Sequence, residues 1–389
     1  MSNARNLANL LGTSTQIKTA KVADEVFQAN ESLIINGDFA IAQRGTSISI
    51  AHDGDSANRN AYLLDRFLNS MNNAYDTFDG TLAQVSDAPE GFSNSLKWTT
   101  GTAEAAVDSN EYHNISHKIE AQNLQHLKYG TSDAKSVTVS FWVKASVTGT
   151  FCLSIYQSDG VRNITSTYTI NSANTWEYKT VTFAGDTGGT INDDNGEGLR
   201  LQWHISAGSD LTSTDATSWG AYSGDRWAYG HAQNAIATTA SATFQLAGCK
   251  MEVGSVATPF RHISYAENLA LCKRYYQLWG TSDVDFQAYP MWTYTTGTSA
   301  TYVDLAEEMR ATPTVTRVGD PINTAGGQVA ADKWAIYQTA WKGCAALTVF
   351  VPCKTGFRLD GTVNTAVTAG GACGLYGGTG CYYTLDAEL

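Results

Sequence analysis

The segment 246–279 constrains the fold most, because a strand pattern, a proline turn and a helix start follow one another within it. Between residues 244 and 253, apolar residues alternate with small or polar ones, as in a strand. The apolar residues are Phe244, Leu246, Met251 and Val253. Gly248 and Gly254 are expected to interrupt or end that strand. Pro259 then turns the chain out, because the residue before a proline avoids the helical region.

A helix is predicted directly after this turn. Ser264 is a candidate N-cap, and Glu267 three residues later would complete a capping box. Apolar and aromatic residues then recur at spacings of three to four residues, at Leu269, Cys272, Tyr276 and Trp279. The segment 263–280 is therefore predicted as a linking helix, which makes the chain two modules on either side of a hinge.

The residues around this hinge match a family pattern. An E-x-G-x-x-A-T-P-F core is present at Glu252, Gly254, Ala257, Thr258, Pro259 and Phe260. An L-x-x-C-x-R-Y-Y motif follows at Leu269, Cys272, Arg274, Tyr275 and Tyr276. This combination resembles the segment that ends the β domain of tail fibres and related appendage virion proteins of tailed phages. The resemblance implies a place on a virion more directly than it implies an activity.

Further stretches extend the same resemblance. They are L-I-x-N-G-D-F at 33–39, A-x-R-G-T at 42–46, Y-x-x-D-R at 62–66, M-R-x-x-P at 309–313 and the LDAEL end at 385–389. Phe67 stands where the family usually has tryptophan. The opening motif also resembles that of jelly-roll carbohydrate-binding modules, which implies such a fold here. Asp65 and Arg66 are expected to form a local ion pair or turn clamp, since most such neighbours are structural.

The composition indicates an all-β protein and excludes several partners. Only 16% of the 389 residues are charged, while Ser, Thr, Gly, Asn and aromatic residues are abundant, as in turn-rich β proteins. A net charge of −12 argues against nucleic acid, which needs clustered Lys and Arg. No apolar stretch approaches the ~20 residues required for membrane insertion. The seven cysteines lack CxxC spacing and the start lacks a signal-peptide pattern, so synthesis in a reducing host cytoplasm is expected.

The predicted fold class is mainly β: a jelly-roll β-sandwich, a short helix and a smaller C-terminal β domain, preceded by a short N-terminal helical leader. The jelly-roll, carbohydrate-binding-like domain is assigned to 31–262, the linking helix to 263–280 and the C-terminal β domain to 281–389. Strands are predicted at 33–35, 137–143, 151–155, 177–183, 199–205, 242–246, 286–294, 301–305, 334–337, 345–351 and 381–385. The glycine-rich segment 366–380 is predicted as an exposed loop.

Residues 1–30 form the predicted leader. A short amphipathic helix is suggested by Asn6, Leu7, Leu10 and Leu11. The leader has too few apolar residues to build a core, so it is expected to order only against a partner. In the resembling proteins such N-termini attach the protein to the particle, which implies contact with other virion tail proteins through 1–30. A frayed tail is the alternative.

The candidate glycan-binding residues are aromatic and close together in the sequence. They are Trp219, Tyr222, Trp227 and Tyr229, within 218–231. Their rings could stack on the flat faces of sugars, and the Gly, Ser and Asp residues between them are typical of recognition loops. The alternative is that these rings pack beneath a long loop or at a subunit contact.

Metal-binding patterns are weak. Loop 191–198 offers hard oxygen donors that suit calcium, at Asp193, Asp194, Asn195 and Glu197, with a solvated turn as the alternative. His113 and His117 have helical i, i+4 spacing but no third ligand nearby. Buried free thiols are favoured over a zinc site for Cys344, Cys353, Cys373 and Cys381. We therefore expect no metal and no cofactor, with calcium as the candidate exception.

No common catalytic motif is present: there is no G-x-S-x-G, no H-E-x-x-H, no P-loop and no dinucleotide fingerprint. The predicted function is that of a non-enzymatic virion protein, a tail fibre or receptor-binding appendage that contacts host cell-surface polysaccharide. Because phage fibres are commonly homotrimers, the resemblance implies a homotrimer. One alternative is a structural adaptor, neck or capsid decoration protein. The other is a polysaccharide-degrading tailspike, whose two carboxylates cannot be chosen from 37 acids.

Overall fold

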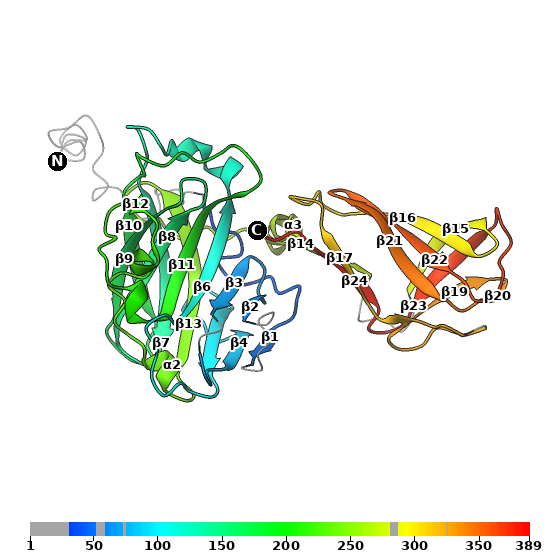
Figure 1. Ribbon diagram of the computed structural model, residues 1–389, viewed down its shortest axis with the longest axis horizontal. Coiled ribbons are helices and arrows are strands. Elements are labelled where there is room, and N and C mark those ends of the chain that lie inside the picture. Colours follow the sequence, from blue (N-terminus) through cyan, green and yellow to red (C-terminus); the bar gives the residue numbers. More distant parts are fainter. Residues whose placement is uncertain (1–30, 52–58, 73–74, 281–286, 325) are drawn as a thin grey trace, which may run out of the picture.

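The computed structural model describes residues 31–51, 59–72, 75–280, 287–324 and 326–389, so the leader predicted at 1–30 lies outside the described residues. The fold is mainly β, as predicted, and Figure 1 shows two β bodies side by side along the long axis of the molecule. Each body has its own hydrophobic core. Among the described residues, no helix is both long and apolar enough to cross a membrane.

The N-terminal body is a sandwich of two antiparallel sheets. The first contains, in spatial order, β1 (Ser47–Ile50), β4 (Gly80–Val85), β5 (Ser95–Thr100), β13 (Thr243–Val253), β7 (Val137–Ala145) and β10 (Glu177–Phe183). The second contains β12 (Gly220–Ala221), β9 (Arg162–Ile170), β8 (Gly149–Gln157), β11 (Glu197–Ala207), β6 (Tyr112–Glu120), β3 (Phe67–Met71) and β2 (Asn60–Tyr62). The chain passes repeatedly between the sheets, as in a jelly roll.

Alternating apolar residues fill the space between these sheets. Val139, Phe141 and Val143 of β7 are fully buried. The Phe141 ring lies 5.8 Å from the ring of Trp203 on β11, so strands of opposite sheets meet in one core. Short helices occupy some connections: η3 (Ala121–Leu127), η4 (Ser209–Leu211), η5 (Gly224–Arg226) and α2 (Ala235–Thr238).

Most predicted strands of this body are present, but the first one is wrong. The segments 137–143, 151–155, 177–183 and 199–205 lie within β7, β8, β10 and β11. Residues 33–35 instead form bends. The amide of Ile34 donates to Ser32 Oγ (3.0 Å) and that of Ile35 to His117 Nε2 (3.4 Å), so neither joins a strand ladder.

The strand before the proline is β13, and Gly248 interrupts it as predicted. The register of β13 against β7 shifts between Ala247 and Lys250, and Gly248 between them has a φ of 55°. A Cβ at this position would collide with the ring of Phe92. Glycine is therefore required both by the backbone conformation and by the close approach of that ring.

The linking helix is shorter than the predicted 263–280. It is α3 (Tyr265–Lys273), and Ser264 caps it by accepting a hydrogen bond from the amide of Glu267 at 3.2 Å. The chain then enters β14 (Tyr276–Gly280), which pairs with β24 (Tyr382–Asp386). The aromatic spacing across 272–279 therefore does not mark one helix, because pairing with a strand about 100 residues away decides the conformation of its second half.

The C-terminal body contains two sheets. The smaller has the order β14, β24 and β17 (Thr314–Val318). The larger contains β18 (Asp320–Pro321), β19 (Lys333–Gln338), β23 (Ala372–Gly377), β15 (Gln287–Thr295), β16 (Thr298–Asp304), β22 (Gly356–Thr362) and β21 (Ala346–Cys353), with β20 (Ala340–Trp341) paired to β19. Its core includes Met291, Trp334 and Tyr383. The predictions at 301–305, 334–337, 345–351 and 381–385 mark four of these strands.

The exposed loop predicted at 366–380 is wrong, because β23 runs through the middle of this segment and pairs on both sides. Its glycines allow close packing of large rings. A Cβ on Gly377 would lie 2.8 Å from the ring of Trp334, and one on Gly374 would collide with Tyr376. Here glycine serves packing within a sheet and does not mark a turn.

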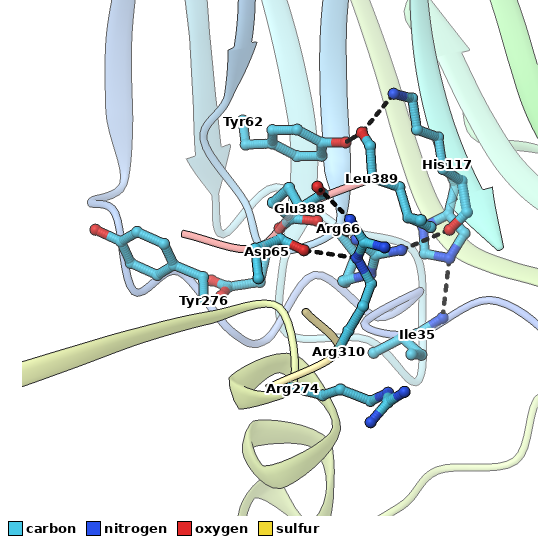
Figure 2. Close-up of polar contacts among 12 residues, drawn as sticks. Ile35, Tyr62, Asp65, Arg66, His117, Arg274, Tyr276, Arg310, Glu388 and Leu389 are labelled. Carbon is cyan, nitrogen blue, oxygen red and sulfur yellow. Dashed lines mark hydrogen bonds and ion pairs between the residues drawn. The ribbon is translucent and has the colours of Figure 1, made fainter. Parts of the chain in front are cut away.

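A cluster of charged and aromatic residues connects the two bodies, and we call it the joint. It consists of Arg44, Asp65, Arg66, Glu120, Arg274, Tyr275, Tyr276, Arg310, Asp386 and Glu388. Figure 2 labels six of them: Asp65, Arg66, Arg274, Tyr276, Arg310 and Glu388. Arg66 is 1% exposed, pairs with Glu388, and its guanidinium lies 3.4 Å from the centre of the Tyr275 ring. Burial opposes the charge of Arg66, but Glu388 leads the opposing contributions and the pKa of Arg66 is raised.

Two further arginines bind the C-terminal tail in the joint. Arg44 lies 3.1 Å from Asp386 and 3.4 Å from Glu388, with its guanidinium 3.7 Å from the centre of the Tyr276 ring. Arg310 donates to the main-chain oxygens of Ala387 (2.7 Å) and Glu388 (3.0 Å). The contacts of Arg44 hold the last strand of the C-terminal body against the N-terminal sandwich, and Arg310 also donates to the main-chain oxygen of Asn195 in the sandwich at 2.6 Å.

The local pair expected between Asp65 and Arg66 is not formed. Asp65 accepts hydrogen bonds from the amide (2.8 Å) and side chain (2.6 Å) of Gln43, while Arg66 turns to Glu388. Arg66 has a φ of 73°, which is unusual for a residue with a side chain, and the two neighbours reach different partners. Arg66 therefore links the two bodies through Glu388, and it does not form an ion pair with Asp65 within a turn.

Candidate functional site

The four candidate aromatic residues do not form one platform. Trp227 is buried: its Nε1 donates to Gln202 Oε1 at 2.8 Å, and its ring lies 4.3 Å from that of Tyr112. Trp219 is half-buried and donates to the main-chain oxygen of Ala184 at 2.7 Å. Both tryptophans therefore hold loop 208–232 against the sandwich, in agreement with the packing alternative.

The two tyrosines are more accessible. Tyr222 is 37% exposed and stands edge-on against Tyr156, with ring centres 5.2 Å apart. Tyr229 is half-buried and lines a hollow of about 500 Å³ beside β8 and β9. The residues around this hollow are Thr150, Thr165, Ser166, Thr167, Thr212, Thr217, Tyr229, Gly230, His231 and Ala232.

Hydroxyl groups dominate the lining of the hollow. Thr165 is 2% exposed, and its Oγ1 has no hydrogen-bond partner among the described residues. A buried hydroxyl without a partner is costly, which indicates that a bound group or water could satisfy it. Thr167 and Thr150 are on the same pair of strands and present further hydroxyls. The lining contains no carboxylate, so it lacks the acid pair that glycoside hydrolysis needs.

The hollow is also uncharged at neutral pH. Burial lowers the pKa of His231 to about 4, so its imidazole is neutral at pH 7. Nε2 of this ring lies 2.6 Å from the main-chain oxygen of Gln233 and donates to it. The site thus combines one aromatic ring, several hydroxyls and a neutral imidazole. This chemistry suits a ligand that is rich in hydroxyl groups and carries no net charge.

The alternation of residues in β9 was a sequence signal for the threonines of the hollow, which the sequence analysis missed. In β9, Ile164, Tyr168 and Ile170 are buried in the core, while Asn163, Thr165 and Thr167 lie on the opposite face. The alternation in NITSTYTI therefore marks a strand with a polar outer face. Nothing local shows that loop 208–232 folds over that face, where the amide of Thr165 donates to the main-chain oxygen of Ala216 at 2.8 Å.

The calcium candidates do not gather around one point. Glu197 binds Arg200 through both carboxylate oxygens (2.9 and 2.8 Å) and lies 3.4 Å from Lys118. Asn195 donates to the main-chain oxygen of Arg310 at 2.5 Å. Asp193 and Asp194 are exposed. Within the described ranges, no group of three or more His, Cys, Asp or Glu side chains could hold a metal.

The histidine and cysteine candidates do not form a metal-binding group among the described residues either. His113 and His117 lie on a strand, β6, where i, i+4 spacing puts both on one face. Both are buried in the core, and burial lowers the pKa of His113 to about 3. The four C-terminal cysteines are free; Cys344, Cys373 and Cys381 are buried and Cys353 is half-exposed.

Fold and site together define a class: a two-body β protein whose jelly roll carries a hydroxyl-lined hollow. No protein-family model and no curated protein matches the chain. Solved structures similar to it include the enzymatically active domain of tailspike protein 4 of bacteriophage CBA120, at 11% identity and a TM-score of 0.29 over 48% of this chain. The match spans only 19% of that tailspike chain.

Two carbohydrate-binding modules are also similar. The family 11 module of Clostridium thermocellum, in complex with a mixed-linked tetrasaccharide, is 12% identical with a TM-score of 0.27, over 60% of this chain and 100% of its own. TmCBM61, in complex with β-1,4-galactotriose, is 8% identical with a TM-score of 0.25, over 57% of this chain and 99% of its own. These scores do not assign the chain to a family.

Proposed function

We propose that the protein is a non-enzymatic component of a phage virion, a tail fibre or receptor-binding appendage that contacts host-surface glycan through its hydroxyl-lined hollow. The observation that carries this proposal is the composition of the joint. All of its members except Glu120 come from the separate stretches that resemble phage appendage proteins: 42–46, 62–66, 269–276, 309–313 and 385–389.

In the folded protein these separate stretches contact one another, so the resembling motifs share a structural role. Arg44 and Arg66 from the start of the chain bind Glu388 at its other end, and Arg310 binds the main chain beside it. Motifs that share one contact cluster specify a way of holding two β bodies together. We infer that the resemblance concerns this architecture, which suits a rigid, elongated appendage.

Glycan contact is supported by the chemistry of the hollow. Sugars present hydroxyl groups that need hydrogen-bond partners and flat faces that suit an aromatic ring. Thr165, Thr167 and Tyr229 offer these groups at one place. Affinity at one such site would be modest, and several copies on a particle would raise it through effective concentration.

The remaining parts of the proposal follow from the resemblance. The leader at 1–30 would attach the protein to other tail proteins, and the chain would assemble as a homotrimer. The finished protein would be exposed on the virion after synthesis in the host cytoplasm. A homotrimer would also protect the edges of the sheets.

The test is binding of the full-length protein to a panel of immobilised bacterial surface polysaccharides, with variants of the hollow. Tyr229→Ala should lower affinity about two- to twelvefold, because an aromatic contact is worth ~0.5–1.5 kcal/mol. Thr165→Val keeps the shape and removes the hydroxyl, and should lower affinity about three- to tenfold. The matched control is Thr169→Val, on the same strand but outside the hollow, which should bind normally.

Three results would contradict the proposal. Retention of no polysaccharide would favour an adaptor or decoration protein. Release of shortened glycans would favour a tailspike enzyme. If Tyr229→Ala and Thr165→Val bind polysaccharide as well as the control Thr169→Val does, the hollow is not the binding site.

A further inference from the structure

The larger C-terminal sheet presents exposed aromatic residues on its outer face. Along β15, Met291 and Thr293 are buried, whereas Trp292 and Tyr294 between and beside them are 60% and 37% exposed. Tyr302 of β16 and Phe350 of β21 are 55% and 44% exposed. These four rings are not among the core residues of this body, and an exposed cluster of large apolar side chains is a feature of interaction surfaces. Figure 1 places β15, β16, β22 and β21 in the body that does not carry the hollow.

The strand register places these rings around one ion pair. Tyr302, Arg358 and Phe350 are cross-strand neighbours in one row, and Ala300, Asp360 and Thr348 form the next row. Trp292 is the cross-strand neighbour of Ala300. Cross-strand neighbours share a face, so the aromatic residues surround Arg358 and Asp360.

At the centre of this face, the charges of Arg358 and Asp360 neutralise each other. Arg358 donates to both carboxylate oxygens of Asp360, through Nε at 2.6 Å and Nη2 at 2.7 Å. Tyr294 OH donates to the same carboxylate at 2.6 Å. The guanidinium lies 5.1 Å from the centre of the Tyr294 ring and 5.8 Å from that of Phe350. Nη1 of Arg358 is outside the carboxylate pairing, so it remains as a donor on this face.

We propose that this aromatic face, defined by Trp292, Tyr294, Tyr302, Phe350, Arg358 and Asp360, is a second binding surface for an uncharged saccharide. The sugar rings stack on Trp292 and Tyr302, and their hydroxyls bond to the Arg358–Asp360 pair. An acidic ligand would find no complementary charge, because the pair cancels and exposed Asp304, on the same side of β16 as Tyr302, adds a negative charge. Small Ala300 between Trp292 and the ion pair leaves the face open to a flat ligand. The inference rests on the proposed glycan contact but uses a different surface from the hollow.

The experiment uses the full-length protein, the panel of neutral and acidic polysaccharides and light scattering of each variant. Trp292→Ala and Tyr302→Ala should each lower affinity for a neutral polysaccharide about tenfold. Tyr265→Ala is the control, because this residue is 62% exposed on α3 and outside both surfaces. A second measurement uses Cys353, whose Sγ lies 3.5 Å from Tyr302 OH. Bound saccharide should slow its alkylation several-fold.

The outcomes separate this inference from the proposed function. If Tyr229→Ala removes binding and the two variants of the aromatic face bind normally, the second surface is refuted while the hollow stands. If the two variants bind normally but change the mass of the assembled protein, the face is a contact between copies, and the inference is also refuted. Preference for an acidic polysaccharide would contradict the reasoning from charge. If wild type binds nothing, both proposals fail.

Discussion

Glu388→Gln should weaken the joint far more than its position at the edge of the C-terminal body suggests. The Glu388 side chain is 5% exposed and pairs with Arg66, which is 1% exposed. Removal of one partner from a buried ion pair leaves the other charge uncompensated and destabilises by about 3–5 kcal/mol. Glutamine can still accept one hydrogen bond, so we expect about 3 kcal/mol, measured by urea unfolding at pH 7 with circular dichroism.

Asp386→Asn is the matched control for this change. Asp386 is two residues earlier and also pairs with an arginine, Arg44 at 3.1 Å, but its side chain is 44% exposed. Exposed pairs contribute about 0–1 kcal/mol, so this variant should unfold almost like wild type. Replacing both buried partners, as Arg66→Met with Glu388→Met, should recover part of the lost stability. Equal unfolding midpoints for Glu388→Gln and Asp386→Asn would refute the conclusion that the buried Arg66–Glu388 pair stabilises the joint.

Two further predictions concern titration and reactivity. Burial lowers the pKa of His113 to about 3 and of His231 to about 4, whereas unfolded histidine titrates near 6.5. The unfolded chain thus binds more protons below pH 6.5, and stability should fall between pH 6.5 and 4 by up to about 1.4 kcal/mol per pH unit for each histidine. Urea midpoints across this range test it, and a slope unchanged in His113→Gln would contradict it. Separately, hydrogen bonds, first from Tyr302 and then from Thr355, lower the pKa of Cys353 to about 7, so iodoacetamide should label it before the buried cysteines. Mass spectrometry that found another cysteine labelled first would overturn this assignment.

The main features of the fold could be predicted because they depend on local patterns. Alternating apolar residues identified β7 and β11, and Ser264 marked the start of α3. Gly248 was recognised as an interruption, since few residues tolerate its conformation. Where local and long-range effects disagreed, the prediction was wrong. Pairing with β24 turned 276–280 into a strand, and packing against Trp334 kept the glycine-rich β23 inside a sheet.

The candidate site was predicted less well. Aromatic density along 218–231 marked a loop that lines the hollow, but two of its four rings are packed against the sandwich. The exposed rings around Arg358 come from β15, β16 and β21, which are far apart in the sequence, so no window of the chain contains them together. Density of a residue type indicates surface chemistry only when the segment's exposed side is known.

The sequence by itself determined the class of fold, the strand that ends the sandwich, the capped helix and the motifs of the joint. These depend on alternation, capping and turn chemistry within a few residues. Only the tertiary structure decided what those motifs do. It separated Asp65 from Arg66, joined Arg66 to Glu388 across the whole chain, and left Thr165 beneath a folded-over loop. The physical reason is that ion pairs and stacking act between groups in space, and sequence distance does not limit which groups meet.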